Sequence, residues 1–222
     1  ALMAGTLFKT SVNYNRVRVH NDEFLPFGLQ PNNTAMTPNG EMYFNPSRFK
    51  EDFSLAEPSD QHWFMHEMVH IWQYQLGYPV MARGAIRIGL EYEYELDPAK
   101  KLSDYNMEAQ GDLLADYWAL KYAGIPELVS MHVYRNRGFI GLYEQVLSRF
   151  NDQASNQSML VGDNDEYVKS VLRRALGDDK ATMLIDRIMQ GSDTSGLEAL
   201  RWMDPAVARE LLRNEHPQIV AA

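Results

Sequence analysis

One stretch of the chain, DQHWFMHEMVHIWQYQL over residues 60–76, constrains the fold more than any other. It predicts a helix with apolar side chains on nearly all sides, and a helix of this kind is normally buried. Ser59 or Asp60 could cap its start. Gly77 marks its end, with Pro79 just beyond. We therefore expect the chain to fold around this helix.

Shorter β-prone runs flank this helix. Residues 14–19 alternate in polarity and predict a strand. Residues 34–45 predict a hairpin, with Pro38-Asn39-Gly40 as its turn and residues 41–44 as its second arm. After the helix, residues 85–96 alternate again and predict another strand or hairpin arm. The helix should thus lie beside a small β-sheet.

The second half of the chain predicts further helices. One begins near Ser103 or Asp104 and ends at Gly124, and helical patterns then continue from Pro126 through Phe150. The fold class we expect is therefore α+β and mainly helical, with a core domain over residues 1–150.

A different composition follows this core. Residues 151–165 are polar and predict a linker. Beyond them, a helical tail is expected over residues 166–222. Its helix-like pieces are residues 166–176, 180–190 and 205–214.

Composition limits the chemistry. The chain has no cysteine, so a metal must be held by His, Asp or Glu. The formal net charge of −9 argues against a nucleic-acid or anionic-membrane surface, because either calls for a basic field. No apolar run is long enough to span a membrane. The first ten residues lack the features of a secretory signal, so we expect a cytoplasmic protein unless another route exports it.

The residues His66-Glu67-Met68-Val69-His70 form the pattern H-E-x-x-H inside the buried helix. Helical spacing puts His66 and His70 one turn apart on one face, so both imidazoles can reach one metal ion. Glu67 lies beside that face, where a carboxylate can take a proton from metal-bound water. The alternative is a buried helix whose histidines bond to backbone carbonyls.

A catalytic zinc ion needs a third protein ligand and one position open to water. Glu108, on the following helix, is the candidate, and Asp112 and Asp116 are lesser rivals. Asp112 lies four residues after Glu108 on the same helix face. It could therefore accept the free ring N–H of a ligand histidine, which fixes the tautomer of that ring. The alternative for Glu108 is an exposed side chain.

Other polar residues near the motif receive smaller roles. His62 is expected to pack or support the site, because three histidines along one helix span about 12 Å, too far for one ion. Tyr92 and Tyr94 are candidates to stabilise the oxyanion of an attacked amide, although core packing is the stronger alternative. Glu91, Glu93 and Glu95 should form a solvated face. No role falls to His20, His132 and His216.

Residues 66–73 (HEMVHIWQ) resemble the zincin metallopeptidases, in the branch whose third zinc ligand is a glutamate on a later helix. This resemblance implies a zincin-like core with His66, His70 and Glu108 as Zn²⁺ ligands and Glu67 as general base. It also implies that the arm of residues 41–45 runs beside the active-site helix and could pair with an extended peptide.

Four shorter motifs narrow the resemblance to small Vgr- or Rhs-related bacterial proteins. They are LPFG, AMTPNG, YEY and YNME, at residues 25–28, 35–40, 92–94 and 105–108. Proteins of this kind are associated with type VI secretion, some as peptidase-like toxins fused to spike proteins. The resemblance covers residues 10–150.

The tail resembles a different protein, the flagellar motor switch protein, its G subunit, over residues 152–222. The motifs that carry this resemblance are YVKSVL, ALG, GSDTSG and NEHPQI, at residues 167–172, 175–177, 191–196 and 214–219. It implies a partner in a secretion spike or a flagellar assembly, reached through the tail.

These observations together predict a zinc-dependent endopeptidase that acts on a peptide or protein substrate. It would be a bacterial effector of type VI secretion, exported by the contractile system without a signal peptide. Two alternatives stand beside it. One is a non-catalytic module that uses the zincin fold as a scaffold for a secretion or flagellar assembly, and the other is a zinc amidase that acts on cell-wall peptide.

Overall fold

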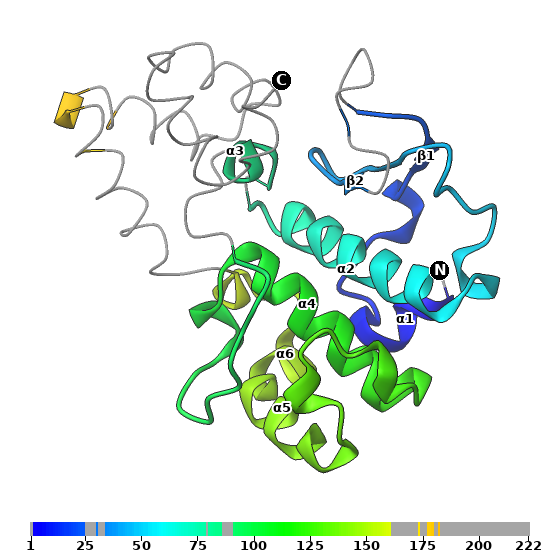
Figure 1. The fold of residues 1–222 in the computed structure, drawn as a ribbon. Coiled ribbons are helices and arrows are strands. Elements are labelled where there is room, and N and C mark those ends of the chain that lie inside the picture. Colours follow the sequence, from blue (N-terminus) through cyan, green and yellow to red (C-terminus); the bar gives the residue numbers. More distant parts are fainter. Residues whose placement is uncertain are drawn as a thin grey trace, which may run out of the picture.

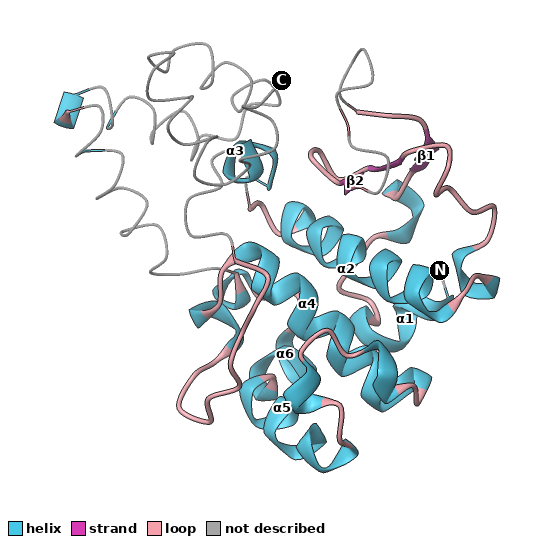
Figure 2. Ribbon diagram, in the orientation of Figure 1, coloured by secondary structure: helices cyan, strands magenta, loops and turns pink. Residues whose placement is uncertain are grey.

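The computed structural model describes residues 2–24, 30, 34–78, 80–85 and 91–160, together with 173, 177–179 and 182. These parts are mainly helical and include one three-stranded sheet (Figures 1 and 2). The expected α+β, mainly helical class is confirmed.

Helix α2 (Pro58–Gln75) crosses the middle of the described part, with the sheet on one side and helices α4, α5 and α6 on the other (Figure 1). Its central residues 65–73 are all buried, as the apolar sequence predicted. The helix starts at Pro58, which suits a first helical position because its missing N–H would have no partner there. This start precedes the expected one by one or two residues. The helix ends before Gly77, whose φ of 95° favours glycine.

Helix α4 (Met107–Trp118) packs along α2 and carries the other half of the site. It is capped by Asn106, whose side chain accepts from the backbone N–H groups of Glu108 and Ala109. The expected start near Ser103 was therefore too early, because a separate 3-10 turn occupies Leu102–Asp104. A π-helical turn continues α4 over Ala119–Ala123 and stops at the predicted Gly124.

The sheet has the strand order β1-β3-β2. Strand β2 (Ala35–Met36) pairs antiparallel with β3 (Met42–Phe44), which confirms the predicted hairpin. Strand β1 (Val19–Asn21) pairs parallel with β3. The strand predicted at residues 14–19 was largely wrong, because Tyr14–Arg16 forms a 3-10 turn whose cap is Asn13.

The turn of the hairpin lies against α2. Gly40 has a φ of 82°, and a Cβ added there would lie 2.6 Å from the ring atom Cε1 of Tyr74. Glycine is therefore required at this position both by the backbone and by the close approach of the helix. This contact fixes the hairpin beside the helix that carries the H-E-x-x-H pattern.

The strand predicted at residues 85–96 is wrong where the structure describes it. Residues 80–85 form helix α3 (Val80–Ala85), residues 86–90 lie outside the described part, and residues 91–96 form no regular element. The alternation still governs burial, because Tyr94 and Leu96 are buried whereas the three glutamates are exposed. The pattern thus sorted most of these side chains between core and solvent without a strand partner, and Tyr92, which is 46% exposed, is the exception.

The C-terminal part of the core consists of α5 (Ile140–Val146) and α6 (Ser148–Gln153), and α1 (Leu2–Phe8) joins them. Aromatic contacts of Phe8 with Trp72 and Phe150 connect α1 to α2 and α6. Short 3-10 turns fill the connections, at Phe53–Leu55, Pro126–Leu128, His132–Tyr134, Arg137–Phe139 and Gln157–Met159.

The segment predicted as a linker is folded onto this core as far as residue 160. Trp72 donates from Nε1 to the carbonyl of Ala154 at 2.7 Å, and Met159 is buried. A polar composition misled the prediction here, because the side chains face water while the backbone bonds to the core. The rest of the linker and the three predicted tail helices lie outside the described residues, apart from single positions.

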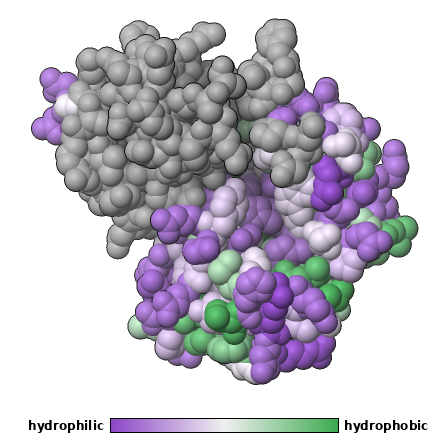
Figure 3. Space-filling view, viewed as in Figure 1, coloured by the Kyte–Doolittle hydropathy of each residue, from purple (hydrophilic) through white to green (hydrophobic). Residues whose placement is uncertain are grey.

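The surface of the described part is mixed in character. The face seen in Figure 3 is largely hydrophilic, with separate apolar patches. Among the described helices, none has the length and apolar character that crossing a bilayer requires.

Candidate metal centre

Two helices bring a row of histidines against a row of acids. On α2 the histidines recur every four residues, and on α4 the acids do the same, so each row follows one helix face. The helices run in opposite directions, and the rows pair in reverse order: His70 with Glu108, His66 with Asp112, and His62 with Asp116.

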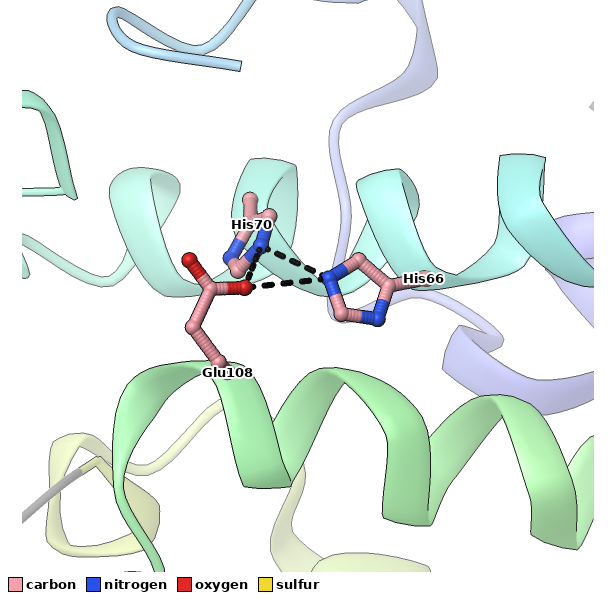
Figure 4. Close-up of side chains that lie close together, drawn as sticks. All are labelled: His66, His70 and Glu108. Atoms are coloured by element: carbon pink, nitrogen blue, oxygen red, sulfur yellow. Dashed lines mark hydrogen bonds and ion pairs between the residues drawn. The ribbon is translucent and has the colours of Figure 1, made fainter. Parts of the chain in front are cut away.

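Three of these side chains converge on one point. The Nε2 atoms of His66 and His70 lie 3.1 Å apart, and each lies 3.2 Å from Oε2 of Glu108 (Figure 4). All three residues are at most 6% exposed. Within the described ranges, no other three His, Asp or Glu side chains converge in this way. The structure thus brings together the three residues that the sequence suggested as ligands.

The spacing fits a tetrahedral zinc ion. Bonds from zinc to nitrogen and oxygen are about 2.1 Å long, so two ligands of one tetrahedral ion lie about 3.4 Å apart. The observed separations of 3.1 and 3.2 Å are close to this value. Two imidazoles and one carboxylate are also a ligand set that catalytic zinc uses.

Hydrogen bonds at the far side of each ring direct a lone pair into the centre. His66 donates from Nδ1 to Asp112 Oδ1 at 2.7 Å, which is the supporting role predicted for Asp112. His70 donates from Nδ1 to Gln73 Oε1 at 2.8 Å. With Nδ1 protonated, each neutral ring turns the lone pair of Nε2 toward Glu108. Three acceptor atoms then face one another, an arrangement that calls for a cation.

The pKa values of the two histidines and of Glu108 also favour a positive charge at this point. Burial opposes a charge on His66, but hydrogen bonds to Asp112 and Glu108 outweigh it and raise its pKa well above 6.5. Burial opposes a charge on His70 too, yet the charge of Glu108 raises the pKa of His70. For Glu108, burial favours the neutral form, but His70 and His66 together hold its pKa well below the usual range. A carboxylate paired with a positive charge is therefore the favoured state.

Glu67 lies next to this centre and is 5% exposed. Its Oε2 accepts a hydrogen bond of 2.5 Å from the hydroxyl of Thr37, in the hairpin after β2. Its charge also helps to raise the pKa of His70. The hairpin therefore fixes one oxygen of Glu67 and leaves Oε1 for other partners.

The two candidate tyrosines are placed differently. The ring of Tyr92 is centred 5.8 Å from the ring of His66, and the residue is 46% exposed, so it borders the centre from the solvent side. Tyr94 is buried, and its hydroxyl bonds to Asp116 and Tyr143 in the core. The hydroxyl of Tyr94 is thus engaged in the core, and the stabilising role stays a prediction for Tyr92.

His62 is partly buried and bonds to α4, in line with the packing role expected for it. It bonds from Nε2 to Asp116 Oδ1 at 2.7 Å. Asp116 is fully buried and also accepts from Tyr94 and from the backbone N–H and hydroxyl of Ser130. Its oxygens are therefore occupied, which removes it as a rival ligand. His20 does not belong to this row of histidines: its Nε2 lies 2.7 Å from Oε2 of Glu41. His216 lies outside the described residues.

Sequence reasoning missed the residues that hold the ligands in place. They are Thr37, Gln73, Gln110 and Gly111. The four-residue spacing that singled out His and Asp carries no signal for Thr37, which arrives from a hairpin. For Gln73, the signal was its position three residues after His70 on the same face of α2.

Part of the chain is similar to a protein of a bacterial secretion system. The type VI secretion system spike protein VgrG2b of Pseudomonas aeruginosa is 38% identical over 126 residues, which are 54% of this chain and 12% of that protein. The solved effector domain of VgrG2b is 34% identical with a TM-score of 0.51, and the match covers 64% of this chain and 78% of that domain.

The later part is similar to a flagellar protein. The profile of the FliG N-terminal domain matches residues 142–197. The flagellar motor switch protein FliG of Pseudomonas aeruginosa is 46% identical over 72 residues, 32% of this chain and 21% of that protein. The FliG of Vibrio cholerae is 43% identical over 56 residues. The profile match begins ten residues before the boundary expected from the sequence, inside α5.

The chain thus spans only about an eighth of the VgrG2b spike protein and about a fifth of FliG. The effector domain of VgrG2b, by contrast, is covered over most of its length at an identity that indicates common descent. The chain therefore belongs to the family of the VgrG2b effector domain.

Proposed function

We propose that this protein is a zinc-dependent endopeptidase that acts as a secretion-associated effector. Similarity to the VgrG2b effector domain supports the effector role and is consistent with export by type VI secretion. The observation that carries the peptidase activity is the convergence of His66, His70 and Glu108 beside the buried carboxylate of Glu67.

In this proposal each residue has one task. His66, His70 and Glu108 would hold the metal. When bound, zinc would act as a Lewis acid that makes water more acidic and polarises the scissile carbonyl. Glu67 takes a proton from the attacking water at Oε1, because Thr37 already occupies Oε2. It then gives this proton to the leaving amine.

The exposed side of the centre is where a peptide would enter. Tyr92 borders it with a half-exposed ring beside His66. In the proposal its hydroxyl donates to the oxyanion that forms when the carbonyl is attacked. The arm of residues 41–45 cannot pair with a peptide as expected, because its strand β3 lies between β1 and β2. The free edge of the hairpin is β2, and an extended peptide could lie along that strand.

The test compares the parent protein with Glu67→Gln. Zinc content is measured by elemental analysis, and cleavage of casein and of cross-linked muropeptides is followed with and without a chelator. We expect Glu67→Gln to retain zinc and to lose at least about 100-fold in kcat, because the amide cannot accept the proton.

The control is Glu57→Gln at the exposed start of the same helix, which makes the same charge change and should leave cleavage unaltered. Cleavage by Glu67→Gln at the parent rate would contradict the proposal. Hydrolysis of muropeptides without hydrolysis of casein would redirect it to a zinc amidase that acts on cell-wall peptide.

A second candidate function rests on the similarity to FliG. In it, the fold is a non-catalytic adaptor, and the later part of the chain docks to a flagellar or secretion assembly. Zinc binding by a parent protein that cleaves neither casein nor muropeptides would favour this adaptor.

A further inference from the structure

Two buried glutamines continue the hydrogen bonding of His70 away from the metal centre. Gln73 accepts from His70 and donates from Nε2 to Oε1 of Gln110 at 2.9 Å and to the carbonyl of Met107 at 3.1 Å. Gln110 in turn donates to the carbonyls of Leu102 at 2.9 Å and Met159 at 3.3 Å. Both glutamines are fully buried.

This chain of bonds has a fixed direction. A backbone carbonyl can only accept, so the amide nitrogen of Gln110 must face Leu102 and Met159. Its oxygen then faces Gln73, whose amide nitrogen must donate and whose oxygen must accept from His70. The direction therefore requires the proton of His70 on Nδ1 and leaves Nε2 as the metal-binding atom.

The series of hydrogen bonds from His70 ends at Met159, in the segment of residues 154–160. Two more hydrogen bonds hold this segment against α2. Ala154 accepts from Trp72 at 2.7 Å, and Gln157 donates to the carbonyl of Leu76 at 2.8 Å. This segment is part of the stretch that matches the FliG N-terminal domain. The ligand His70 is thus connected to the FliG-like part of the chain through Gln73 and Gln110.

We infer that Gln73 and Gln110 are positioning residues that couple zinc binding at His70 to the docking of residues 154–160. The inference rests on the metal site of the proposed function, but it does not require catalysis. Coupling of this kind is reciprocal. If the docked segment holds His70 in the metal-binding tautomer, then bound zinc must stabilise the docked segment.

The first experiment measures zinc affinity of the full chain by competition with a chromophoric chelator. Gln110→Leu preserves much of the side-chain volume and does not touch His70, yet it breaks the chain of bonds. We expect its affinity for zinc to fall about 10-fold, the lower end of the range for residues that support metal ligands. Gln73→Leu, which removes the direct partner of His70, should lose up to about 100-fold.

The control is Gln75→Leu, on helix α2 with Gln73. Gln75 also makes two hydrogen bonds through its amide, but to the backbone of Asn13 at the surface. Its loss should leave zinc affinity within about two-fold of the parent value. An unchanged affinity in Gln110→Leu would overturn the inference, as would an equal loss in Gln75→Leu.

The second experiment uses the parent protein and needs no variant to fold. Hydrogen exchange of backbone amides is compared with and without zinc. We expect zinc to slow exchange in residues 154–160 as well as in α2 and α4. Unchanged exchange in 154–160, or a parent protein that binds no zinc, would contradict the inference. Zinc binding with slowed exchange but no peptide cleavage would leave it standing and count against the peptidase.

Discussion

Gly111 shows how closely α4 approaches the candidate metal centre. A Cβ added to this residue would lie 2.7 Å from Nδ1 and 2.9 Å from Nε2 of His66. Real Cβ atoms do not approach a ring so closely, and the ring is held in place by its bonds to Asp112 and Glu108. The absence of a side chain at this position is what lets the imidazole of His66 turn toward Glu108.

Gly111→Ala is therefore expected to displace His66 and to lower zinc affinity by about 10-fold or more. Alanine favours a helix interior over glycine by about 1 kcal/mol, so helix propensity alone would predict a more stable protein. The measurement is chelator competition together with thermal unfolding. Gly141→Ala in α5 is the control, because a Cβ there meets nothing within 4 Å. Parent-like zinc affinity in Gly111→Ala would show that His66 can yield without losing the metal.

At the scale of elements, the pairing of α2 with α4 determines which histidine does what. Both helices repeat a polar residue every four positions, and their antiparallel packing matches the two series. His66 and His70 face the end of α4 that carries Glu108, whereas His62 faces Asp116. One sequence pattern thus supplies the candidate metal centre at one end and a buried hydrogen-bond network at the other.

His62→Ala and His66→Ala should accordingly have different effects. His66→Ala removes a ligand and should abolish tight zinc binding. His62→Ala should retain it, but lose roughly 1–3 kcal/mol of stability, because the buried Asp116 loses a donor. Urea unfolding without zinc and a zinc titration separate the two effects. If His62→Ala lost zinc binding to the same extent as His66→Ala, the three histidine–acid pairs between α2 and α4 would depend on one another.

The three candidate ligands could be predicted from the sequence. Helical spacing alone placed His66 and His70 on one face, and the lack of cysteine left Glu108 as a third candidate ligand. The partner of each histidine could not be predicted, because the relative shift of two antiparallel helices depends on packing. Thr37 could not be predicted either, since a hairpin far along the chain delivers it.

The misread elements have a common physical origin. Residues 91–96 alternate in polarity as a strand would, but the structure buries Tyr94 and Leu96 without a strand partner. Alternation reports which side chains face the core, and it does not report whether backbone bonds form. The start of α4 was misplaced because Asn106 competes with Ser103 as a cap and has the better geometry.

At the scale of the whole molecule, protons would compete with the proposed zinc ion for the same centre. The pKa values of His66 and His70 are raised, so protons remain bound at a pH where an ordinary imidazole with a pKa of 6.5 would be neutral. Metal binding must displace these protons. Zinc affinity should therefore fall as the pH is lowered, and the fall should begin above 6.5.

The measurement is zinc affinity across a series of pH values from about 9 to about 5, with the zinc-dependent shift in Tm as a second readout. Both quantities should decrease steadily toward acid. An affinity that stays constant down to about pH 6 would mean that the two imidazoles carry no extra proton in the metal-free protein.

The two similarities meet inside a single packed body. The FliG profile begins at residue 142, yet Tyr143, Val146, Leu147 and Phe150 are among the most deeply buried residues of the structure. A division of the chain into an effector domain and a tail remains a prediction beyond residue 160. Up to that residue, the described chain shows continuous packing and no tether.

That overlap restricts how such a gene can change by recombination. A donor sequence spliced in after residue 141 would have to bring its own large apolar side chains to fill the hole beneath α2 and α4. A replacement that lacks them would leave a cavity in the core and would destabilise the fold.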